Sequence, residues 1–333
     1  MKKVLGMFLG LTIILLLAAC GGSDSAQGEG DGETITWKLG HLANEEHQWH
    51  KTAEKFAELV KEKTDGKLQI EIYPNEQLGS EIEVLNSIEA GTVDMTISGE
   101  SMQNWAPEAA LMAVPYAFKN EEHLKKVIEG EIGKEIESAI KEKVGVTPLY
   151  YHLRAPRNLT SKKPIKSPED LEGFKMRVPN VPLFMDAWEA AGASPQVMAF
   201  SEVFTAIQQG VIDGQENPVD LIHSASFYEV QNYVNKTQHV RSWIYVVVGN
   251  EQLNSLSEDM QAAVKEAAKE AQEYGMKLYK EETDKYIKML KDEGMEFVEV
   301  DQDAFAEAMK PAVEKSLNEE QLKLYEKILK AAK

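Results

Sequence analysis

The sequence predicts an α/β fold of two lobes, in which mixed sheets are flanked by helices. Strand-like and helix-like patterns alternate from residue 35 to residue 209, an order that implies parallel or mixed sheets with helices on their faces. A later segment, Tyr233 to Val248, is rich in β-branched and aromatic residues and is expected to carry strand back into the first unit. Chain crossings of this kind leave a cleft between two lobes, which is a common place for a small-ligand site.

Residues 1–19 are predicted to be a secretory signal peptide. Lys2 and Lys3 precede an apolar run from Val4 to Ala19, which is too short and wrongly flanked for a spanning helix that stays in the protein. Cys20, the single cysteine of 333 residues, follows this run directly. Residues 21–33 have no apolar residue larger than alanine, so residues 20–33 are expected to form a flexible tether that begins at Cys20.

The first lobe is expected to comprise residues 34–153 together with about 243–282. Strand patterns occur at 34–39, 68–72 and 93–98, and a helical period from 45 to 63 stops before an Asp-Gly pair. Ser80 and Glu83 form a capping-box pattern for a helix that Gly91 ends, and further helices are expected from 121 to 143.

The second lobe is expected to comprise residues 154–242 together with about 283–310. Ser167 and Pro168 mark a helix start, with the cap at serine and proline in the first turn. The α/β alternation then repeats, with strands at 174–178 and 194–197 and helices at 181–191 and 201–209.

Residues 255–293 have helix-forming composition over an unusual length. Two alternatives are open: a helix pair broken near Gly275, or one long helix that braces both lobes. A last strand is expected at 296–300, and amphipathic helices are expected from 303 to the end, with residues 311–333 assigned to C-terminal helices outside the two lobes.

Arg177 is the first candidate for a binding residue. In FKMRVP, apolar residues alternate with Lys175 and Arg177 before a proline, which predicts a half-buried strand with the arginine at its end, pointing away from the apolar face. A guanidinium presents a planar fork of donors that matches both oxygens of a carboxylate. The alternative is a surface arginine paired with one of the many acidic side chains.

Asn217 and Arg157 are expected beside Arg177, at strand ends where open α/β folds bind ligands. In GQENP, Gly214 permits a tight turn and Asn217 can both donate and accept hydrogen bonds, although an ordinary Asn-Pro turn is the alternative. These residues predict a pocket for a carboxylate.

The charge balance excludes one class of partner. With 36 Lys and Arg against 55 Asp and Glu, the formal net charge is −19, which argues against nucleic acid and against a polybasic membrane patch. An acidic protein repels anions at long range, so carboxylate binding must depend on a few arginines inside a water-poor cleft.

Other site chemistries find little support. His47 and His50 lie one helical turn apart, but EHQWH is not the HExxH pattern of a zinc protease, and an exposed helix face is expected instead of a metal site. Phosphate-loop, dinucleotide and calcium-loop motifs are not found, and Gly99-Glu100-Ser101 does not complete a GxSxG elbow. Neither a cofactor nor an enzymatic activity is predicted. Trp188 and Phe184 are expected in the core.

Several ungapped blocks in order resemble the substrate-binding subunit of TRAP (tripartite ATP-independent periplasmic) transporters, the C4-dicarboxylate-binding-protein-like family. They are IEIYPNEQLGSE, PEAALMAVPYAF, KMRVPN followed by GASP, MAFSEVFTAIQQGVIDGQENP and FYEVQ. The resemblance implies a hinged, two-lobed periplasmic-binding-protein-like fold, and it favours the single long helix as a brace.

The resemblance also implies roles for individual residues. Arg177 matches the arginine that grips the ligand carboxylate, and Asn217 matches the pocket asparagine of the family. Arg157 matches a second arginine by its spacing to Arg177, although this sequence reads APR there. Phe200 corresponds to an aromatic residue that flanks the ligand in relatives.

Two further residues bear on which acid is bound. Arg154 is an additional cation that faces a second acid group or simply the solvent, and a second acid group would suit a C4-dicarboxylate. Glu100 lies where some relatives place a hydroxyl-binding acid, which would suit a sugar acid. Leu42 stands where some sialic-acid-binding relatives have asparagine, which argues against that ligand.

The resemblance implies an extracytoplasmic solute receptor that binds a small organic acid and delivers it to a TRAP permease driven by an ion gradient. LAAC resembles the bacterial lipobox, which implies a lipidated Cys20 that anchors the protein to the cell membrane. Alternatives are a receptor for an ATP-driven (ABC) importer or a sensor kinase, and a secreted lipoprotein enzyme that acts on an organic acid.

Overall fold

The computed structural model describes residues 34–332. The predicted signal peptide (1–19), the predicted lipidation at Cys20 and the predicted tether (20–33) lie outside the described residues. None of the described helices combines the length and the apolar character that crossing a membrane requires.

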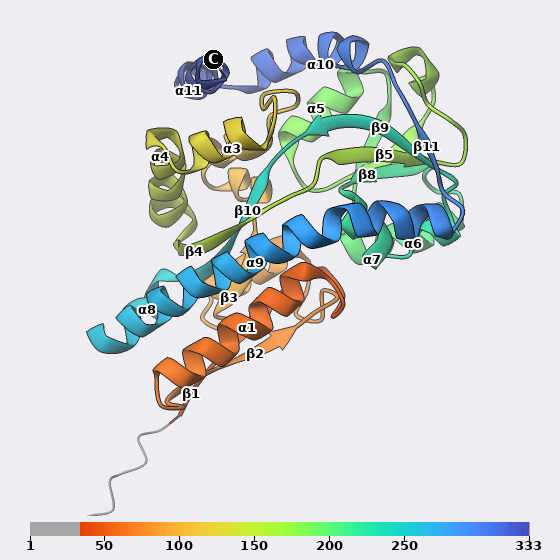
Figure 1. The fold of residues 1–333 in the computed structure, drawn as a ribbon. Coiled ribbons are helices and arrows are strands. Elements are labelled where there is room, and N and C mark those ends of the chain that lie inside the picture. The colour runs from red at the N-terminus through yellow and green to blue at the C-terminus, as the bar shows by residue number, and fades with distance from the viewer. Residues whose placement is uncertain (1–33, 333) are drawn as a thin grey trace, which may run out of the picture. The chain divides into compact units, whose positions relative to one another are not determined.

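Two mixed sheets define two lobes in residues 34–332, and Figure 1 shows their arrangement. In lobe I the strand order is β2 (Leu68–Tyr73), β1 (Ile35–Gly40), β3 (Met95–Ser98), β10 (Trp243–Gly249) and β4 (Val146–Leu153). In lobe II the order is β11 (Glu296–Val298), β9 (Tyr233–Val240), β5 (Arg157–Ser161), β8 (Gly214–Asn217), β6 (Lys175–Val178) and β7 (Ser194–Val197). The predicted α/β fold with mixed sheets is confirmed.

Parallel and antiparallel pairs occur in both sheets. In lobe I, β1 is parallel to β2 and β3, whereas β10 is antiparallel to β3 and β4. In lobe II, β6 is parallel to β7 and β8, and β5 is antiparallel to β8 and β9. The parallel pairs need crossover connections, and helices provide them.

Helices flank both sheets. Around lobe I lie α1 (Gln48–Lys63), α2 (Glu81–Glu89), α3 (Glu121–Ile128), α4 (Glu131–Ala139), α8 (Asn250–Asn254) and the short helical segments η1 (Glu100–Asn104), η2 (Pro107–Ala113) and η3 (Ile140–Val144). Around lobe II lie η4 (Pro168–Leu171), α5 (Pro182–Ala190), α6 (Phe200–Gln208), α7 (Val219–Ser224) and η5 (Phe227–Glu229). Phe184 and Trp188 of α5 are buried, as predicted.

The chain crosses between the lobes at residues 154–156, which link β4 to β5, and at 241–242, which link β9 to β10. The two crossings touch, because the amide of Arg154 donates to the carbonyl oxygen of Ser242 at 3.1 Å. The prediction that 233–248 returns strand to the first unit is therefore confirmed, with β9 in lobe II and β10 in lobe I.

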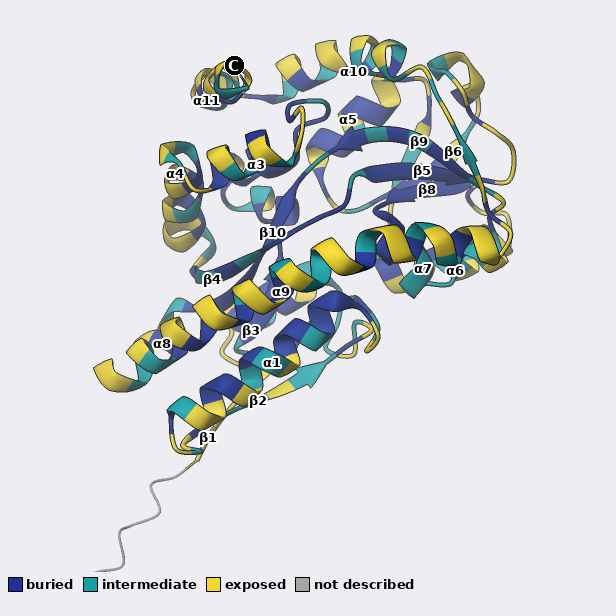
Figure 2. Ribbon diagram, viewed as in Figure 1, coloured by how far each residue is buried: buried dark blue, intermediate teal, exposed yellow. Residues whose placement is uncertain are grey.

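Helix α9 (Glu258–Asp292) is continuous over 35 residues and packs on α1 and β4 of lobe I and on α7 of lobe II. Of the two alternatives, the single long helix is confirmed. Gly275 does not break it: a Cβ there would lie 3.1 Å from the side chain of Thr52 and 3.3 Å from that of His152, so glycine permits close packing of α9 on α1 and β4. Figure 2 shows buried and exposed residues alternating along α9.

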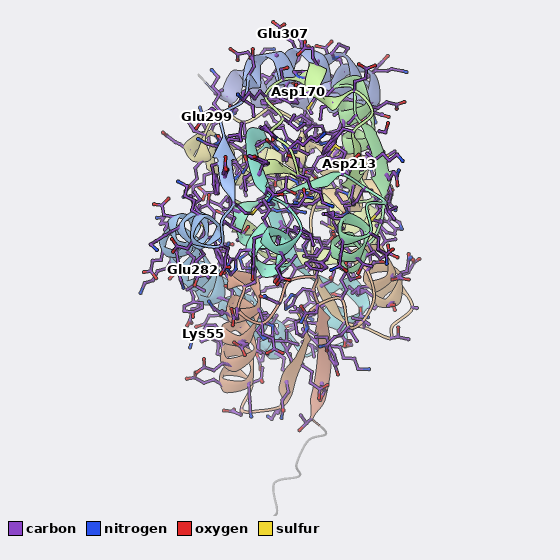
Figure 3. The ribbon with its side chains drawn as sticks, turned by 90° about the vertical axis from the view of Figure 1, so that its right-hand side faces the viewer. Lys55, Asp170, Asp213, Glu282, Glu299 and Glu307 are labelled. Carbon is purple, nitrogen blue, oxygen red and sulfur yellow. The ribbon has the colours of Figure 1, made fainter. Side chains whose placement is uncertain are left out.

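The C-terminal helices also reach both lobes. Helix α10 (Gln302–Ser316) packs on α5, and α11 (Glu319–Ala331) packs on α3 and η2. The helices expected from residue 303 to the end are confirmed, and Pro311 lies inside α10. The acidic surplus is spread over the surface, where Asp170, Glu299 and Glu307 are exposed (Figure 3).

Candidate functional site

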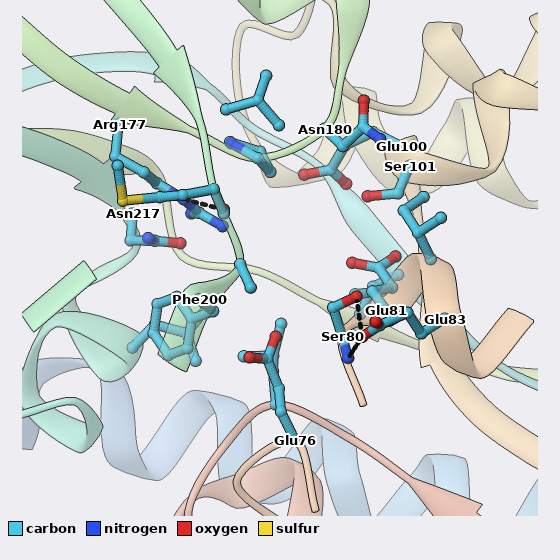
Figure 4. Close-up of a pocket in the computed structure, with 18 of the residues that line it drawn as sticks. Glu76, Ser80, Glu81, Glu83, Glu100, Ser101, Arg177, Asn180, Phe200 and Asn217 are labelled. Carbon is cyan, nitrogen blue, oxygen red and sulfur yellow. Dashed lines mark hydrogen bonds between the residues drawn. The ribbon is translucent and has the colours of Figure 1, made fainter. Parts of the chain in front are cut away.

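A cavity of about 290 Å³ lies between the lobes. Lobe I contributes Glu81 of α2 and Glu100 of η1, and lobe II contributes Arg177 of β6, Phe200 of α6 and Asn217 of β8. Figure 4 shows the lobe II group and the lobe I acids on opposite sides of the cavity. All six residues singled out in the sequence line it: Arg154, Arg157, Arg177, Phe200, Asn217 and Glu100.

Arg177 is buried at the edge of this cavity. Its guanidinium stacks 5.7 Å from the ring centre of Phe200, and its Nε donates to the carbonyl oxygen of Met198 at 3.0 Å. The prediction of a half-buried strand is wrong here, because Met176, Arg177 and Val178 are all buried: the cleft covers the face that carries the arginine.

The charge of Arg177 has no direct counter-ion within the described chain. Among residues 34–332, Arg177 forms no salt bridge within 4.0 Å. Burial lowers the pKa of Arg177 to about 10, so the group is still a cation at neutral pH. A surface ion pair, the alternative considered for this residue, is therefore wrong. A buried cation without a counter-ion favours an anion in the cavity.

Asn217 ends β8 next to Arg177. Its Nδ2 donates to Oε1 of Gln215 at 2.6 Å, and its backbone lies opposite Asn158 of β5. The predicted tight turn at Gly214 is wrong, since Gly214 begins the strand. A Cβ at Gly214 would lie 2.1 Å from the carbonyl oxygen of Thr160, so the glycine serves close strand packing.

Arg157 lines the cavity but already has a carboxylate partner. Its Nε lies 2.5 Å and its Nη2 lies 2.6 Å from the two carboxylate oxygens of Glu216, a bidentate pair, and Nη2 also donates to the carbonyl oxygen of Glu216. His239 lies 2.9 Å from the same carboxylate. Arg157 is thus a less available cation than the sequence indicated.

Burial alone would raise the pKa of Glu216 and lower that of Arg157. The charges and hydrogen bonds of the pair reverse both effects, holding the pKa of Glu216 at about 2 and raising the pKa of Arg157. Glu216 was missed in the sequence, although it stands beside Asn217 in GQENP. An acidic residue inside an otherwise buried strand was the available signal.

Arg154 and Glu100 form a second buried pair. Nη1 of Arg154 donates to Oε1 of Glu100 at 2.7 Å, and the guanidinium lies 5.6 Å from the ring centre of Trp49. A solvent-facing Arg154 is therefore wrong. The other oxygen of Glu100, Oε2, is buried without a hydrogen-bond partner among residues 34–332. Because Glu100 lines the cavity, this oxygen is an acceptor suited to a hydroxyl donor.

Two acidic residues that line the cavity, Glu81 and Glu76, were not identified as site residues from the sequence. Oε1 of Glu81 accepts a hydrogen bond from the hydroxyl of Ser98 and one from the amide of Gly99 at 3.3 Å. Glu76 of lobe I accepts from the amide of Ser201 in α6 of lobe II at 2.9 Å. Both lie in the block IEIYPNEQLGSE, but their roles did not follow from it, because each meets its partner only through tertiary packing.

His47 and His50 are buried, so the predicted exposed helix face is wrong. Nε2 of His47 lies 3.2 Å from a carboxylate oxygen of Asp220 in α7, and Nδ1 of His50 lies 3.1 Å from Nε2 of His41. The start of α1 packs against lobe II, which explains the burial. In the described range 34–332, no group of three or more His, Cys, Asp or Glu side chains is arranged to hold a metal ion.

A family model described as "Bacterial extracellular solute-binding protein, family 7" matches residues 39–320. The chain belongs to this family. Members of the family are extracytoplasmic solute-binding receptors and not enzymes, and the resemblance to TRAP solute-binding subunits is confirmed.

Two solved structures show the likeness of fold. A TRAP periplasmic solute-binding protein from Roseobacter denitrificans OCh 114, with bound L-galactonate, is 55% identical with a TM-score of 0.87, covering 89% of this chain and 99% of that chain. One from Sulfitobacter sp. NAS-14.1, with bound β-D-galacturonate, is 30% identical with a TM-score of 0.86 and the same coverage of 89% and 99%.

Another relative is named for a different ligand class, the C4-dicarboxylates. The C4-dicarboxylate-binding periplasmic protein of Rhodobacter capsulatus is 31% identical over 297 residues, which are 88% of this chain and 86% of the relative. The family thus includes receptors described with sugar acids and with dicarboxylates.

Proposed function

We propose that this chain is the extracytoplasmic receptor of a TRAP-type, ion-gradient-driven permease and that its solute is a sugar acid. Arg177 binds the solute's carboxylate, Phe200 packs beside it, and Asn217 and Arg157 complete that end of the site. The observation that carries the proposal is the buried guanidinium of Arg177, which has no carboxylate partner among residues 34–332.

The opposite end of the cavity suits hydroxyl groups. Glu100 offers an unpartnered buried oxygen, and Glu81 adds a second carboxylate on the same wall. A hydroxyl donates to such oxygens, whereas an apolar end would leave a buried acceptor without a partner, at a cost of about 1–3 kcal/mol. The bound L-galactonate and β-D-galacturonate of the two similar structures are polyhydroxylated acids with a single carboxylate.

A thermal-shift screen tests this proposal. Aldonates and uronates are expected to raise the melting temperature, because a ligand at 100 times its Kd stabilises the folded state by about 2.7 kcal/mol. Neutral sugars with the same hydroxyl pattern serve as controls and are expected to give no shift. Reconstituted uptake that needs a sodium gradient and no ATP distinguishes a TRAP permease from an ATP-driven importer, and recovery of the solute chemically unchanged excludes an enzyme.

The lobes are proposed to close over the solute, with the crossings at 154–156 and 241–242 and helix α9 as the hinge. Hydrogen bonds that join the two lobes besides any solute include that of Glu76 with the amide of Ser201, and that of Nδ2 of Asn104 with the carbonyl oxygen of Asn180 at 3.0 Å. The closed form is the one that a permease would recognise. Bound solute therefore shifts the equilibrium from the open form to the closed form.

Glu76→Ala is expected to weaken solute affinity about 3–10-fold, because a cap of this kind contributes about 1 kcal/mol to the closed form. The N-cap residue of α6 is Ala199, which has no side-chain acceptor, so Glu76 supplies the oxygen from the other lobe. Titration calorimetry measures the affinity, and small-angle scattering measures the closed fraction. Glu76→Gln keeps an acceptor oxygen and is expected to have a smaller effect; equal losses in both variants would contradict the capping role.

We also propose that lipidation of Cys20 anchors the mature protein to the cell membrane. The position of this cysteine directly after the apolar run supports the proposal. The intact mass of the membrane-extracted protein checks it, since the mature chain would begin at Cys20 and carry acyl groups.

A further inference from the structure

Three arginines line the cavity, but within residues 34–332 only Arg177 has no carboxylate partner, while Nε of Arg154 is buried without a hydrogen-bond partner. Arg154 is paired with Glu100, and Arg157 is paired with Glu216. Arg177 alone among the three forms no salt bridge within residues 34–332. The cation content of the site therefore matches one carboxylate.

The wall opposite Arg177 is acidic (Figure 4). Glu81 is fixed by two donors on one oxygen, the hydroxyl of Ser98 and the amide of Gly99. Burial raises the pKa of Glu81, the hydrogen bond from Ser98 opposes this shift, and the charge of Glu100 on the same wall raises the pKa further. Among residues 34–332, no further arginine or lysine lines the cavity to neutralise a third acidic group.

Building on the sugar-acid function proposed above, we propose that Glu81 and Glu100 make this receptor selective for solutes with a single carboxylate. A hydroxyl at the far end of the solute donates to these carboxylates. A second carboxylate at that end offers no donor, adds negative charge beside two acids, and meets a cation, Arg154, that Glu100 already neutralises.

Pairs of solutes that differ only at one end test this selectivity. L-galactonate and galactarate have the same carbon skeleton and stereochemistry, and the second replaces the terminal CH₂OH by a carboxylate; gluconate and glucarate form a second pair. The test uses the pair whose aldonate binds more tightly. For that pair, titration calorimetry on the natural protein is expected to give a Kd for the aldonate at least 100-fold lower than the Kd for the matching aldarate.

Glu81→Gln removes the charge and keeps the shape and an acceptor for Ser98. It is expected to reduce the aldonate preference at least tenfold. Glu100→Gln, which also frees Arg154, is expected to reduce the preference in the same direction. The matched control is Glu89→Gln, an exposed residue at the other end of α2, which is expected to leave the preference unchanged.

The outcomes separate the two proposals. Equal affinity for aldonate and aldarate in the natural protein, or a preference that neither Glu81→Gln nor Glu100→Gln reduces, would overturn the selectivity claim while the sugar-acid function stands. Failure of every aldonate and uronate to bind would overturn the sugar-acid function itself, and the selectivity claim with it. Melting curves of the unliganded variants verify that each is folded.

Discussion

Arg177→Lys is expected to weaken solute binding by about 100-fold or more, which corresponds to about 2.7 kcal/mol. The ammonium offers a point charge in place of two parallel hydrogen bonds, and lysine also lacks the Nε that now donates to Met198. Truncating one partner of a buried charge pair costs about 2–5 kcal/mol, so the expected loss lies within the usual range. Titration calorimetry with the best solute of the thermal-shift screen measures it.

The same residue is expected to limit the stability of the unliganded protein. Arg177→Met removes a buried charge that has no salt-bridge partner within the described chain, so the unliganded variant is expected to be more stable by about 1 kcal/mol or more. Calorimetric melting without solute measures the change. An affinity that is unchanged in Arg177→Lys would mean that the anion is held elsewhere. An unliganded Arg177→Met variant less stable than the natural protein would contradict the expected cost of the buried charge.

Glu216→Gln is expected to destabilise the protein by about 3–5 kcal/mol, because it removes the bidentate partner of the buried Arg157 guanidinium and leaves only the carboxylate of Glu100, 3.6 Å away. Replacing both partners, as in Arg157→Met with Glu216→Leu, is expected to recover most of this loss, since no buried charge remains. Glu299→Gln breaks an exposed pair with Lys236 and serves as the control, with an effect expected within about 0.5 kcal/mol. Denaturant unfolding measures all three.

Glu216 also predicts a dependence on pH. Its pKa is lowered from 4.5 to about 2 in the folded protein, so its contribution to stability is fully present above pH 4.5 and is lost as the pH falls towards 2. The natural protein is therefore expected to lose more stability over this window than the Glu216→Gln variant. Parallel unfolding curves for the two proteins from pH 5 to pH 2 would contradict this prediction.

Much of the architecture followed from local patterns. The alternation of strand and helix periods predicted the α/β fold, and the return of strand at 233–248 predicted the crossing between lobes. These features depend on the periodicity of apolar side chains along short segments. That periodicity can be read from a single sequence. Helix α10 runs through Pro311, so the division expected there between lobe II and the C-terminal helices does not coincide with a helix end.

The site was predicted in its members but not in its electrostatics. All six expected side chains line one cavity, but the sequence did not show that Arg154 and Arg157 are already paired with glutamates while Arg177 is not. Arg157 pairs with a glutamate 59 residues away and Arg154 with one 54 residues away. Whether a buried charge is free to bind a solute depends on its partners in the fold. No local sequence pattern identifies a partner 54 or 59 residues away.

The sequence by itself determined the order of the elements, the long helix as a candidate brace and the family to which the chain belongs. Only the tertiary structure decided which arginine is free for a solute and which acidic side chains face it. The physical reason is that secondary structure and family motifs are encoded in neighbouring residues, whereas the charge available in a cavity is the sum over side chains that folding alone brings together.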